Sequence, residues 1–346
     1  MNILDLEFKE LENFIKEAGQ PGFRASQLYG WIAKGVTEPE DMRNVPKAFW
    51  ETEGLKELRA ELPDVVTTQH SEDGTVKCRL RMKDGCSVEA VFMKYKYGNS
   101  ICISSQAGCR MGCAFCASGM NGLERDLTPG EMYGEILAVE KETGEKISHI
   151  VVMGTGEPFD NYENLSKFIR IINDPKGRNL GMRNITVSTC GLAPVIERFG
   201  DDFPQVNLAI SLHAADSRER SEIMPVNRAY PLEELIEACR RYTEKTGRRI
   251  TFEYTLIKDV NDDKKHLDKL SDLLKGMLCH VNLIPLNEVK EKSFRSGTRE
   301  RAQEFRDALE NRGIPATVRR ELGSDIDAAC GQLRAKKWLK KGHFFG

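Results

Sequence analysis

The spacing of hydrophobic positions along this 346-residue chain changes twice. Residues 5–18 place apolar side chains at helical spacing, a Gly-Gln-Pro-Gly break follows, and residues 23–32 predict a second short helix. Residues 40–60 suggest further helices. We therefore expect a small helical domain over residues 1–62, which could be a nucleic-acid adaptor or a simple helical cap.

The pattern becomes strand-like between Val65 and Met93. Apolar residues alternate with polar ones between two strong turn dipeptides, Asp73-Gly74 and Asp84-Gly85. The alternation predicts a β-hairpin, which we place in a connecting segment over residues 63–99.

After Ser100 strands and helices alternate regularly. Strands are predicted at 101–104, 148–153, 184–189, 206–211, 250–257 and 280–285, and helices at 129–143, 161–173, 193–199, 231–247, 262–276 and 298–312. Strand–helix units in series predict a parallel sheet with helices outside it. Because six units are too few to close an eight-stranded barrel, we expect an α/β fold, an open, partial (β/α)6 barrel, over residues 100–346.

Composition narrows the class of protein. The net charge of −2 predicts no strong nonspecific attraction to nucleic acid, although basic clusters could form a local patch. No apolar run approaches the ~18 residues of a membrane span, and the N-terminus lacks the pattern of a signal peptide. We expect a cytoplasmic protein without membrane contact, in which ten cysteines point to metal binding or catalysis before structural disulfides.

Three cysteines, Cys109, Cys113 and Cys116, lie at C-x3-C-x2-C spacing in a short loop rich in Gly and Ala. Three thiolates cannot alone close a four-coordinate structural metal site, but they can hold three irons of a [4Fe-4S] cluster. The fourth iron then keeps an open position for a ligand that is not protein. The alternatives are a zinc site that borrows a fourth ligand and three buried apolar cysteines.

Unusual residues directly follow the predicted strands, where ligands bind in parallel α/β folds. The stretch from Gly154 to Pro158 could bring bare backbone close to a ligand, or could be a tight turn. The other strand-end residues are Ser188, Ser211, Leu212, His213 and Asn287. Together they predict a polar rim around the cysteine loop.

Two further cysteines stand apart from this loop. Cys102 lies on the predicted strand that leads into it, and Cys330 lies in a flexible segment of small and acidic residues from Gly323 to Leu333. Either one alone could be a buried apolar cysteine. We assign the remaining cysteines to the core; they are Cys78, Cys86, Cys190, Cys239 and Cys279.

With these motifs in place, the chain resembles the RlmN family, dual-specificity radical S-adenosylmethionine (SAM) methyltransferases that act on C2 of adenine in 23S ribosomal RNA and transfer RNA. The resemblance extends over nearly the whole chain. It is specific at the segments Cys102 to Cys116, Gly156 to Pro158, Ser211 to His213 and Gly323 to Leu333.

The resemblance implies a [4Fe-4S] cluster on the loop cysteines and two SAM molecules per turnover. It implies SAM contacts from Gly156, Glu157, Ser188, Ser211, Leu212, His213 and Asn287. Glu157 would then meet the SAM amine. Cys330 would carry the methyl group, Cys102 would resolve the RNA adduct through a transient disulfide, and Glu89 falls where the family places a proton acceptor.

The same resemblance implies 23S rRNA and tRNA as partners, the tRNA being modified at the adenine 3′ of the anticodon. The helical leader would bind RNA, an external flavodoxin- or thioredoxin-like reductant would reset the disulfide, and we expect a monomer. Candidate phosphate contacts are Arg24, Arg319, Arg320, Arg334, Lys336, Lys337, Lys340 and Lys341; each could instead belong to a solvated charged face.

Two alternatives stay open. The sister Cfr-type family methylates C8 of the same ribosomal adenine and typically has Ala where this chain has Pro158, which favours C2 here. Thr155 departs from the Met that is more common in the family, a change that a backbone contact would survive. A non-catalytic metal-binding, RNA-binding protein is the other possibility, and it leaves Cys102 and Cys330 unexplained.

Overall fold

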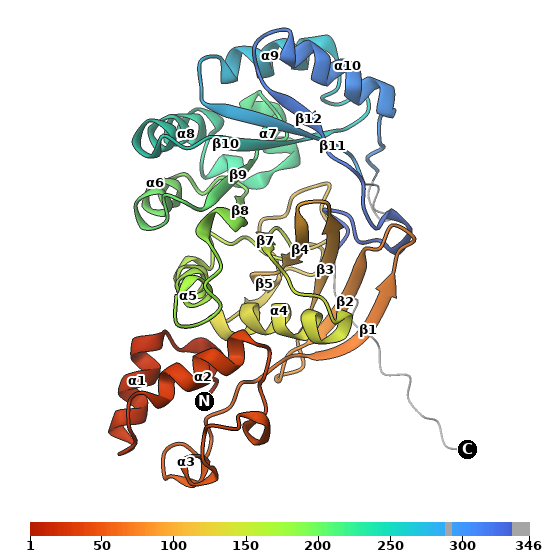
Figure 1. The fold of residues 1–346 in the computed structure, drawn as a ribbon. Helices are drawn as coiled ribbons and strands as arrows, with labels where there is room; N and C mark the ends of the chain where they lie inside the picture. Colours follow the sequence, from red (N-terminus) through yellow and green to blue (C-terminus); the bar gives the residue numbers. More distant parts are fainter. Residues whose placement is uncertain (288–292, 334–346) are drawn as a thin grey trace, which may run out of the picture.

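The structure, a computed structural model, describes residues 1–287 and 293–333, and all structural statements concern these residues. The N-terminal helices α1 (Phe8–Glu17), α2 (Arg24–Ala33) and α3 (Lys47–Glu51) gather below the rest of the chain (Figure 1). The first two match the predicted helices, whereas residues 40–60 contain only the five-residue α3 and a 3-10 turn. Asp5 joins this region to the main body by accepting a hydrogen bond from the Gly130 amide at 2.7 Å.

A single ten-stranded sheet forms the centre of the molecule, in the order β1-β2-β3-β4-β7-β8-β9-β10-β11-β12. Its strands are β1 (Asp64–His70), β2 (Val76–Arg81), β3 (Ser87–Tyr95), β4 (Gly98–Ile103), β7 (His149–Val152), β8 (Ile185–Thr189), β9 (Asn207–Ser211), β10 (Ile250–Leu256), β11 (Cys279–Pro285) and β12 (Ala316–Val318). Every pairing from β4 to β12 is parallel, and the pairings among β1 to β4 are antiparallel.

Helices follow the parallel strands and cover the outer face of the sheet (Figure 1). They are α4 (Pro129–Thr143), α5 (Tyr162–Asn173), α6 (Ala193–Asp202), α7 (Ser217–Ile223), α8 (Leu232–Thr246), α9 (Lys264–Leu274) and α10 (Arg299–Glu310). A capping box is present at the start of α4, where Thr128 and Glu131 each accept a hydrogen bond from the other's amide. The α/β fold with an open parallel sheet is therefore confirmed.

Four elements differ from the sequence prediction. A seventh parallel strand, β12, extends the sheet beyond the six predicted units, and α7 was not predicted. The short strands β5 (Gln106–Gly108) and β6 (Leu123–Asp126) pair with each other and flank the cysteine loop. The predicted hairpin is present, but its strands are continuous with the main sheet, because β3 pairs with β4 and sets Val91 opposite Cys102.

The C-terminal segment, residues 319–333, closes the opening between the two ends of this curved sheet (Figure 1). Its apolar side chains pack on the inner face against β3 and β4. This small cluster contains Val91, Met93, Cys102, Leu322, Ala328 and Leu333. The packing brings the neighbourhood of Cys330 to the inner face of β4.

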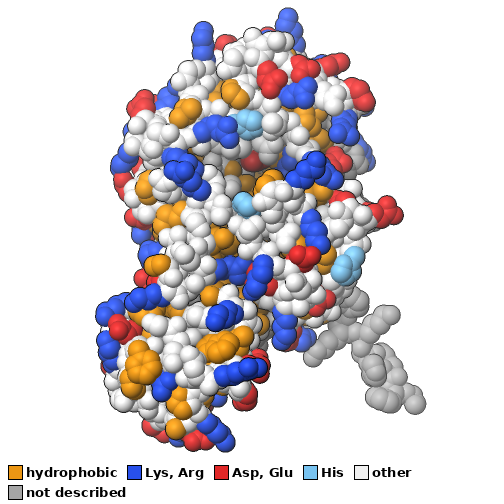
Figure 2. All heavy atoms as spheres, viewed as in Figure 1, with side chains coloured by type: hydrophobic (Ala, Val, Ile, Leu, Met, Phe, Trp, Pro, Cys, Tyr) orange, Lys and Arg blue, Asp and Glu red, His pale blue; other side chains and the backbone are white. Residues whose placement is uncertain are grey.

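Charged side chains of both signs are interspersed over the face shown in Figure 2. Within the described residues, none of the helices has the length and apolar character that a membrane span requires.

Candidate active site

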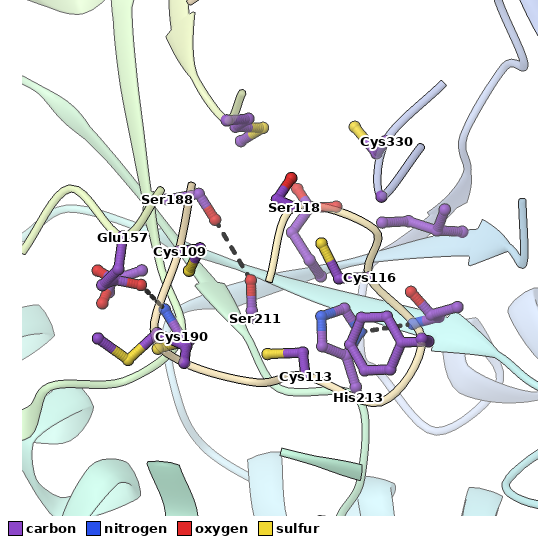
Figure 3. Close-up of a pocket in the computed structure, with 18 of the residues that line it drawn as sticks. Cys109, Cys113, Cys116, Ser118, Glu157, Ser188, Cys190, Ser211, His213 and Cys330 are labelled. Carbon is purple, nitrogen blue, oxygen red and sulfur yellow. Dashed lines mark hydrogen bonds between the residues drawn. The ribbon is translucent and has the colours of Figure 1, made fainter. Parts of the chain in front are cut away.

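A cavity of about 160 Å³ lies at the carboxyl edge of the parallel strands (Figure 3). Its walls come from the cysteine loop and from the residues that end or follow β7, β8, β9, β11 and β12. The predicted residues that line it are Cys109, Cys113, Cys116, Gly156, Glu157, Ser188, Ser211, His213, Asn287 and Cys330. The structure therefore brings most of the sequence-predicted residues to one place.

The cysteine loop is held by backbone contacts on both sides. The Cys109 amide donates to Gly122 O at 3.0 Å and the Ala114 amide donates to Ile223 O at 2.8 Å. Gly108 has a φ of 79°, and a Cβ there would lie 2.0 Å from Gly122 O, so only glycine fits. The loop therefore presents its three thiols to the cavity from a fixed frame.

The donor set fits a cluster. Burial raises the pKa of Cys109 to about 12 and also raises the pKa of Cys113, and metal binding would stabilise both thiolates. In residues 1–287 and 293–333, no three His, Cys, Asp or Glu side chains are grouped so that they could hold a metal ion. Cluster ligands bind separate irons and so need not converge on one point, which suits three cysteines spread around one cavity.

The Gly154 to Pro158 turn packs directly against the strand that leads into the cysteine loop. Thr155 O accepts hydrogen bonds from the Ser105 and Gln106 amides at 2.9 and 3.1 Å. Gly156 has a φ of 107°, and a Cβ at this position would lie 2.6 Å from Gln106 Cβ. The backbone of this turn is therefore bare because close approach and positive φ both demand glycine.

Glu157 is buried beneath this turn and is fully engaged with backbone. One carboxylate oxygen accepts from the Cys190 amide at 2.7 Å and the other accepts from the Phe159 amide at 3.0 Å. Burial raises the pKa of Glu157 despite these hydrogen bonds. Its carboxylate thus ties the turn after β7 to the loop after β8, in addition to lining the cavity where a ligand amine was expected.

His213 presents a defined hydrogen-bonding face. Its Nδ1 accepts from the Thr255 amide at 3.0 Å, which leaves Nε2 as the protonated donor of the neutral ring. Burial lowers the pKa of His213 to about 3, so the ring is neutral at pH 7. The ring of Phe115 packs edge-on at 4.7 Å.

Ser188 and Ser211 lie next to each other in the cavity wall. Ser188 Oγ and Ser211 Oγ are 3.5 Å apart, and both hydroxyls line the cavity (Figure 3). The neighbouring Leu212 differs, because its side chain is fully buried in the core and does not line the cavity.

Cys330 lies where two cavities meet. It lines the large cavity with the loop cysteines and also a smaller one, of about 40 Å³, with Cys102. The Asn287 side-chain amide donates to Cys330 O at 3.1 Å, and the Ala117 amide donates to Gly331 O at 2.8 Å. These contacts attach the Cys330 segment to the cysteine loop itself.

Cys102 and Glu89 occupy the inner face of β4 and β3. Cys102 is buried, and burial followed by the nearby Cys330 thiol raises its pKa. Glu89 is also buried, and its carboxylate lies 3.9 Å from Lys77 Nζ. Glu89 lines neither of the two cavities.

Sequence reasoning missed several residues of the site. Arg319, considered above as a phosphate contact, lines both cavities and lies 3.9 Å from the buried Glu253 carboxylate. The nearby Cys330 raises the pKa of Arg319. Cys190, assigned to the core, lines the large cavity. No local signal marks Arg319, because it follows the unpredicted β12, whereas the position of Cys190 directly after a predicted strand was a usable signal.

The other candidate phosphate contacts are only partly described. Arg320 is exposed and lines the smaller cavity. Arg24 donates to Gln27 Oε1 and Asn44 O. The basic tail, with Arg334, Lys336, Lys337, Lys340 and Lys341, lies outside the described residues.

Comparison with known proteins identifies the class first. Residues 103–270 match the radical SAM superfamily, and residues 1–63 match the ribosomal RNA large subunit methyltransferase N-terminal domain. The crystal structure of a radical SAM methyltransferase from Sphaerobacter thermophilus superposes with a TM-score of 0.92 at 45% identity, covering 96% of this chain and 99% of that one. The fold and the cysteine loop are those of a radical SAM enzyme.

Curated relatives define the family. A probable dual-specificity RNA methyltransferase RlmN from Clostridium perfringens is 52% identical, with 99% of both chains covered. A protein of the same name from Caldanaerobacter subterraneus subsp. tengcongensis is also 52% identical, with 99% of both chains covered. The chain belongs to the RlmN family of dual-specificity RNA methyltransferases, for which a [4Fe-4S] cluster, SAM and RNA substrates are implied.

Proposed function

We propose that this radical SAM RNA methyltransferase modifies C2 of adenine in 23S rRNA and in tRNA, at the adenine 3′ of the anticodon in the latter. One observation carries the proposal: Cys330 borders both the cavity of the loop cysteines and the cavity of Cys102. A thiol that must first carry a methyl group and then form a disulfide needs both neighbours.

Cys109, Cys113 and Cys116 would hold the [4Fe-4S] cluster. SAM would be bound by Gly156, Glu157, Ser188, Ser211, Leu212, His213 and Asn287. When bound, the cluster and SAM supply a carbon-centred radical. His213 contributes the Nε2–H donor of a neutral ring and Gly156 contributes bare backbone, while Leu212, whose side chain is in the core, is limited to a backbone contact.

C2 of adenine is electron-poor and is not a nucleophile, so it cannot attack the methyl group of SAM directly. Cys330 would deliver the methyl carbon instead. The thiolate is the form of cysteine that accepts a methyl group. Arg319 lines both cavities with Cys330, so its guanidinium lies in the same part of the site as the sulfur that would carry the methyl group. Two SAM molecules would be consumed per turnover.

Cys102 would release the product. Its thiolate attacks Cys330 Sγ, a disulfide forms, and the bond between Cys330 Sγ and the RNA-bound carbon breaks, leaving an electron pair on carbon that is then protonated. The two electrons that reopen the disulfide come from an external reductant, which we expect to be flavodoxin- or thioredoxin-like. Burial favours the protonated Cys102 thiol, so Cys102 gives up one proton as it attacks, which balances the proton that the released carbon takes up.

Glu89 is the proposed acceptor of the C2 proton. Because side chains alternate along a strand, Glu89 faces the same side of β3 as Val91 and Met93, which line the smaller cavity. Lys77 beside it balances its charge.

The domain division also stays a proposal. Residues 1–62 would bind RNA, residues 63–99 would connect, and residues 100–346 would carry the chemistry. We also expect the protein to be a cytoplasmic monomer that acts on both RNAs.

Mass spectrometry of nucleosides from a bacterial strain that lacks its own enzyme and is complemented with this chain tests the proposal. We expect 2-methyladenosine in 23S rRNA and in tRNA, and none when the complementing gene carries Cys330→Ala. Recovery of 8-methyladenosine would establish the Cfr-type activity, against which Pro158 argues. The absence of any new methylated adenosine would leave a non-catalytic RNA-binding protein.

A further inference from the structure

Tyr95 and Tyr97 form a stacked aromatic pair where β3 turns into β4. Their ring centroids are 4.9 Å apart and their planes differ by 10°. The Tyr97 ring also meets His149, at the start of β7, edge-on at 5.1 Å. Tyr97 is nevertheless 67% exposed, whereas Tyr95 is half-buried.

The inner ring of this pair belongs to the wall of the active site. Tyr95 lines the smaller cavity together with Cys102, Cys330 and Arg319. An aromatic surface therefore runs from solvent, at Tyr97, to the cavity in which the two catalytic cysteines are proposed to meet. Exposed aromatic area adjoining a site commonly marks a binding surface.

Two arginines lie beside this aromatic surface. Arg319 and the exposed Arg320 line the same cavity as Tyr95. Lys94 and Lys96 are exposed next to Tyr95 in the chain, but Lys94 faces away from Tyr95 across β3, toward Glu145. Acidic side chains are present too: Glu145 pairs with Lys94 at 2.8 Å and Glu321 lines the cavity. Arg319 lies 3.9 Å from the Glu253 carboxylate. Arg320 and Lys96 have no ion pair with a carboxylate of the described residues.

Aromatic rings beside arginine and lysine are the chemistry that holds single-stranded RNA. Bases that have left a helix stack on Tyr, Phe or Trp, and cations contact the adjoining phosphates. The target adenine must leave its stack to reach Cys330, which costs a few kcal/mol. A neighbouring base that stacks on a tyrosine offsets part of that cost.

We propose that Tyr95 and Tyr97 form a stacking platform for an unpaired RNA base next to the target adenine. The adenine itself enters the smaller cavity toward Cys330, and Arg320 contacts the phosphate between the two nucleotides. This inference rests on the proposed function, because it takes the Cys330 cavity as the place where the adenine reacts.

Tyr97 is the position to test, because it is exposed and touches neither cysteine cavity, so its replacement leaves folding and cofactor binding intact. The ligand is a synthetic RNA stem–loop with an unpaired adenine. The protein is the cluster-loaded, SAM-bound chain under anaerobic conditions without reductant, so that binding is measured without turnover. Tyr97→Leu should raise the dissociation constant roughly tenfold, since stacking of one base is worth that order of free energy.

Tyr97→Phe keeps the ring and should bind within twofold of the unaltered chain. Leu278→Ala, at another exposed apolar residue just before β11, is the matched surface control and should also have no effect. Tyr97→Leu binding within twofold of the unaltered chain would overturn the platform. Equal losses in Tyr97→Phe and Tyr97→Leu would do the same, because the ring would then not be the binding element.

A second readout follows the base directly. With 2-aminopurine placed beside the adenine, stacking should quench its fluorescence in the unaltered chain and in Tyr97→Phe, but not in Tyr97→Leu. A chain that binds and quenches but never produces 2-methyladenosine would refute the proposed function and leave the platform standing. A chain that methylates RNA normally with no Tyr97-dependent quenching would refute the platform alone.

Discussion

Two regions enclose Cys330, and they are held in place by different means. On one side, the turn after β7 is fixed by main-chain hydrogen bonds, such as those from the Ser105 and Gln106 amides to Thr155 O. On the other side, the segment from Gly323 to Leu333 contains no strand and is attached mainly through single contacts. The first region leaves almost no freedom to the side chains that would hold the cofactors.

Some contacts of the second region come from the turn between β1 and β2. Ser71 Oγ donates to Asp325 Oδ1 at 2.6 Å, and the Gly323 amide donates to Asp73 Oδ2 at 2.9 Å. The first is exposed and the second is only partly buried, so competition with water makes local opening easy. We call the turn after β7, together with the cysteine loop, the cofactor wall. A rigid cofactor wall that faces a loosely attached Cys330 segment suits a reaction in which Cys330 must act at two cavities in turn.

The largest expected effects come from replacing Cys330 or Cys102, because the two cysteines are proposed to act at different steps. Cys330→Ala should retain cluster iron and SAM binding and give no detectable RNA methylation, because the methyl carrier is gone. Cys102→Ala should still acquire the methyl group but trap RNA covalently, because no thiol is left to break the bond. Denaturing gel electrophoresis of enzyme–RNA mixtures detects the trapped species.

Cys279→Ala is the matched control, since this buried thiol lies in β11 outside both cavities. It should turn over normally. If Cys102→Ala also turned over normally with no crosslinked RNA, the resolving role of Cys102 would be wrong.

The next prediction concerns the three cysteines proposed to hold the cluster. Anaerobic reconstitution should give roughly four irons per chain, and Cys113→Ala should lose most of that iron. Cys190→Ala is the control, because Cys190 is a buried cysteine that lines the same cavity but is outside the cysteine loop. Iron retained in Cys113→Ala, or lost equally in Cys190→Ala, would mean that the ligand set has been misassigned.

Local signals in the sequence predicted the frame of this wall well. The α4 helix begins and ends where expected because its start is a local device, the Thr128 capping box with proline in the first turn. The parallel strands are short segments rich in apolar and β-branched residues, and the cysteine spacing is a short-range pattern. Such features need no knowledge of distant residues.

The parts that were missed depend on distant partners. β12 is three residues long and exists because it pairs with β11. The hydrogen bond that the Glu157 carboxylate accepts from the amide of Cys190, 33 residues away, was not predicted. Arg319 reaches Glu253 across the sheet. Nothing near these residues in the sequence encodes these contacts, because they form only when distant strands pair in the folded sheet.

Rigidity of the cofactor wall is tested at Gly156. Gly156→Ala combines a positive φ with a Cβ 2.6 Å from Gln106 Cβ, and should destabilise the metal-free chain by about 2–4 kcal/mol. Gly181→Ala, where φ is negative and the nearest atom to a Cβ is 3.9 Å away, should change stability by less than about 0.5 kcal/mol. Urea unfolding followed by circular dichroism measures both, and equal midpoints would mean that the turn is not rigid.

The smallest expected effect is at the attachment of the C-terminal segment. Although partial burial raises it, hydrogen bonds from Thr75 and from the Gly323 amide lower the pKa of Asp73 to about 2. The contribution of Asp73 is therefore present above its ordinary pKa near 4 and is lost as the pH falls toward 2. Because Asp73 is exposed, Asp73→Asn should weaken docking by only about 0.5–1 kcal/mol at pH 7.

Hydrogen exchange of the peptide that carries Gly323 to Leu333 measures this docking. At pH 7 the segment should exchange a few-fold faster in Asp73→Asn, and the difference from the unaltered chain should shrink as the pH approaches 2, where both side chains are neutral. Asp64→Asn is the control, because Asp64 pairs with Arg81 on the same antiparallel strands without touching the segment. A segment that exchanges equally slowly in all three proteins would be as rigid as the cofactor wall, and Cys330 would then have to reach both cavities by side-chain rotation alone.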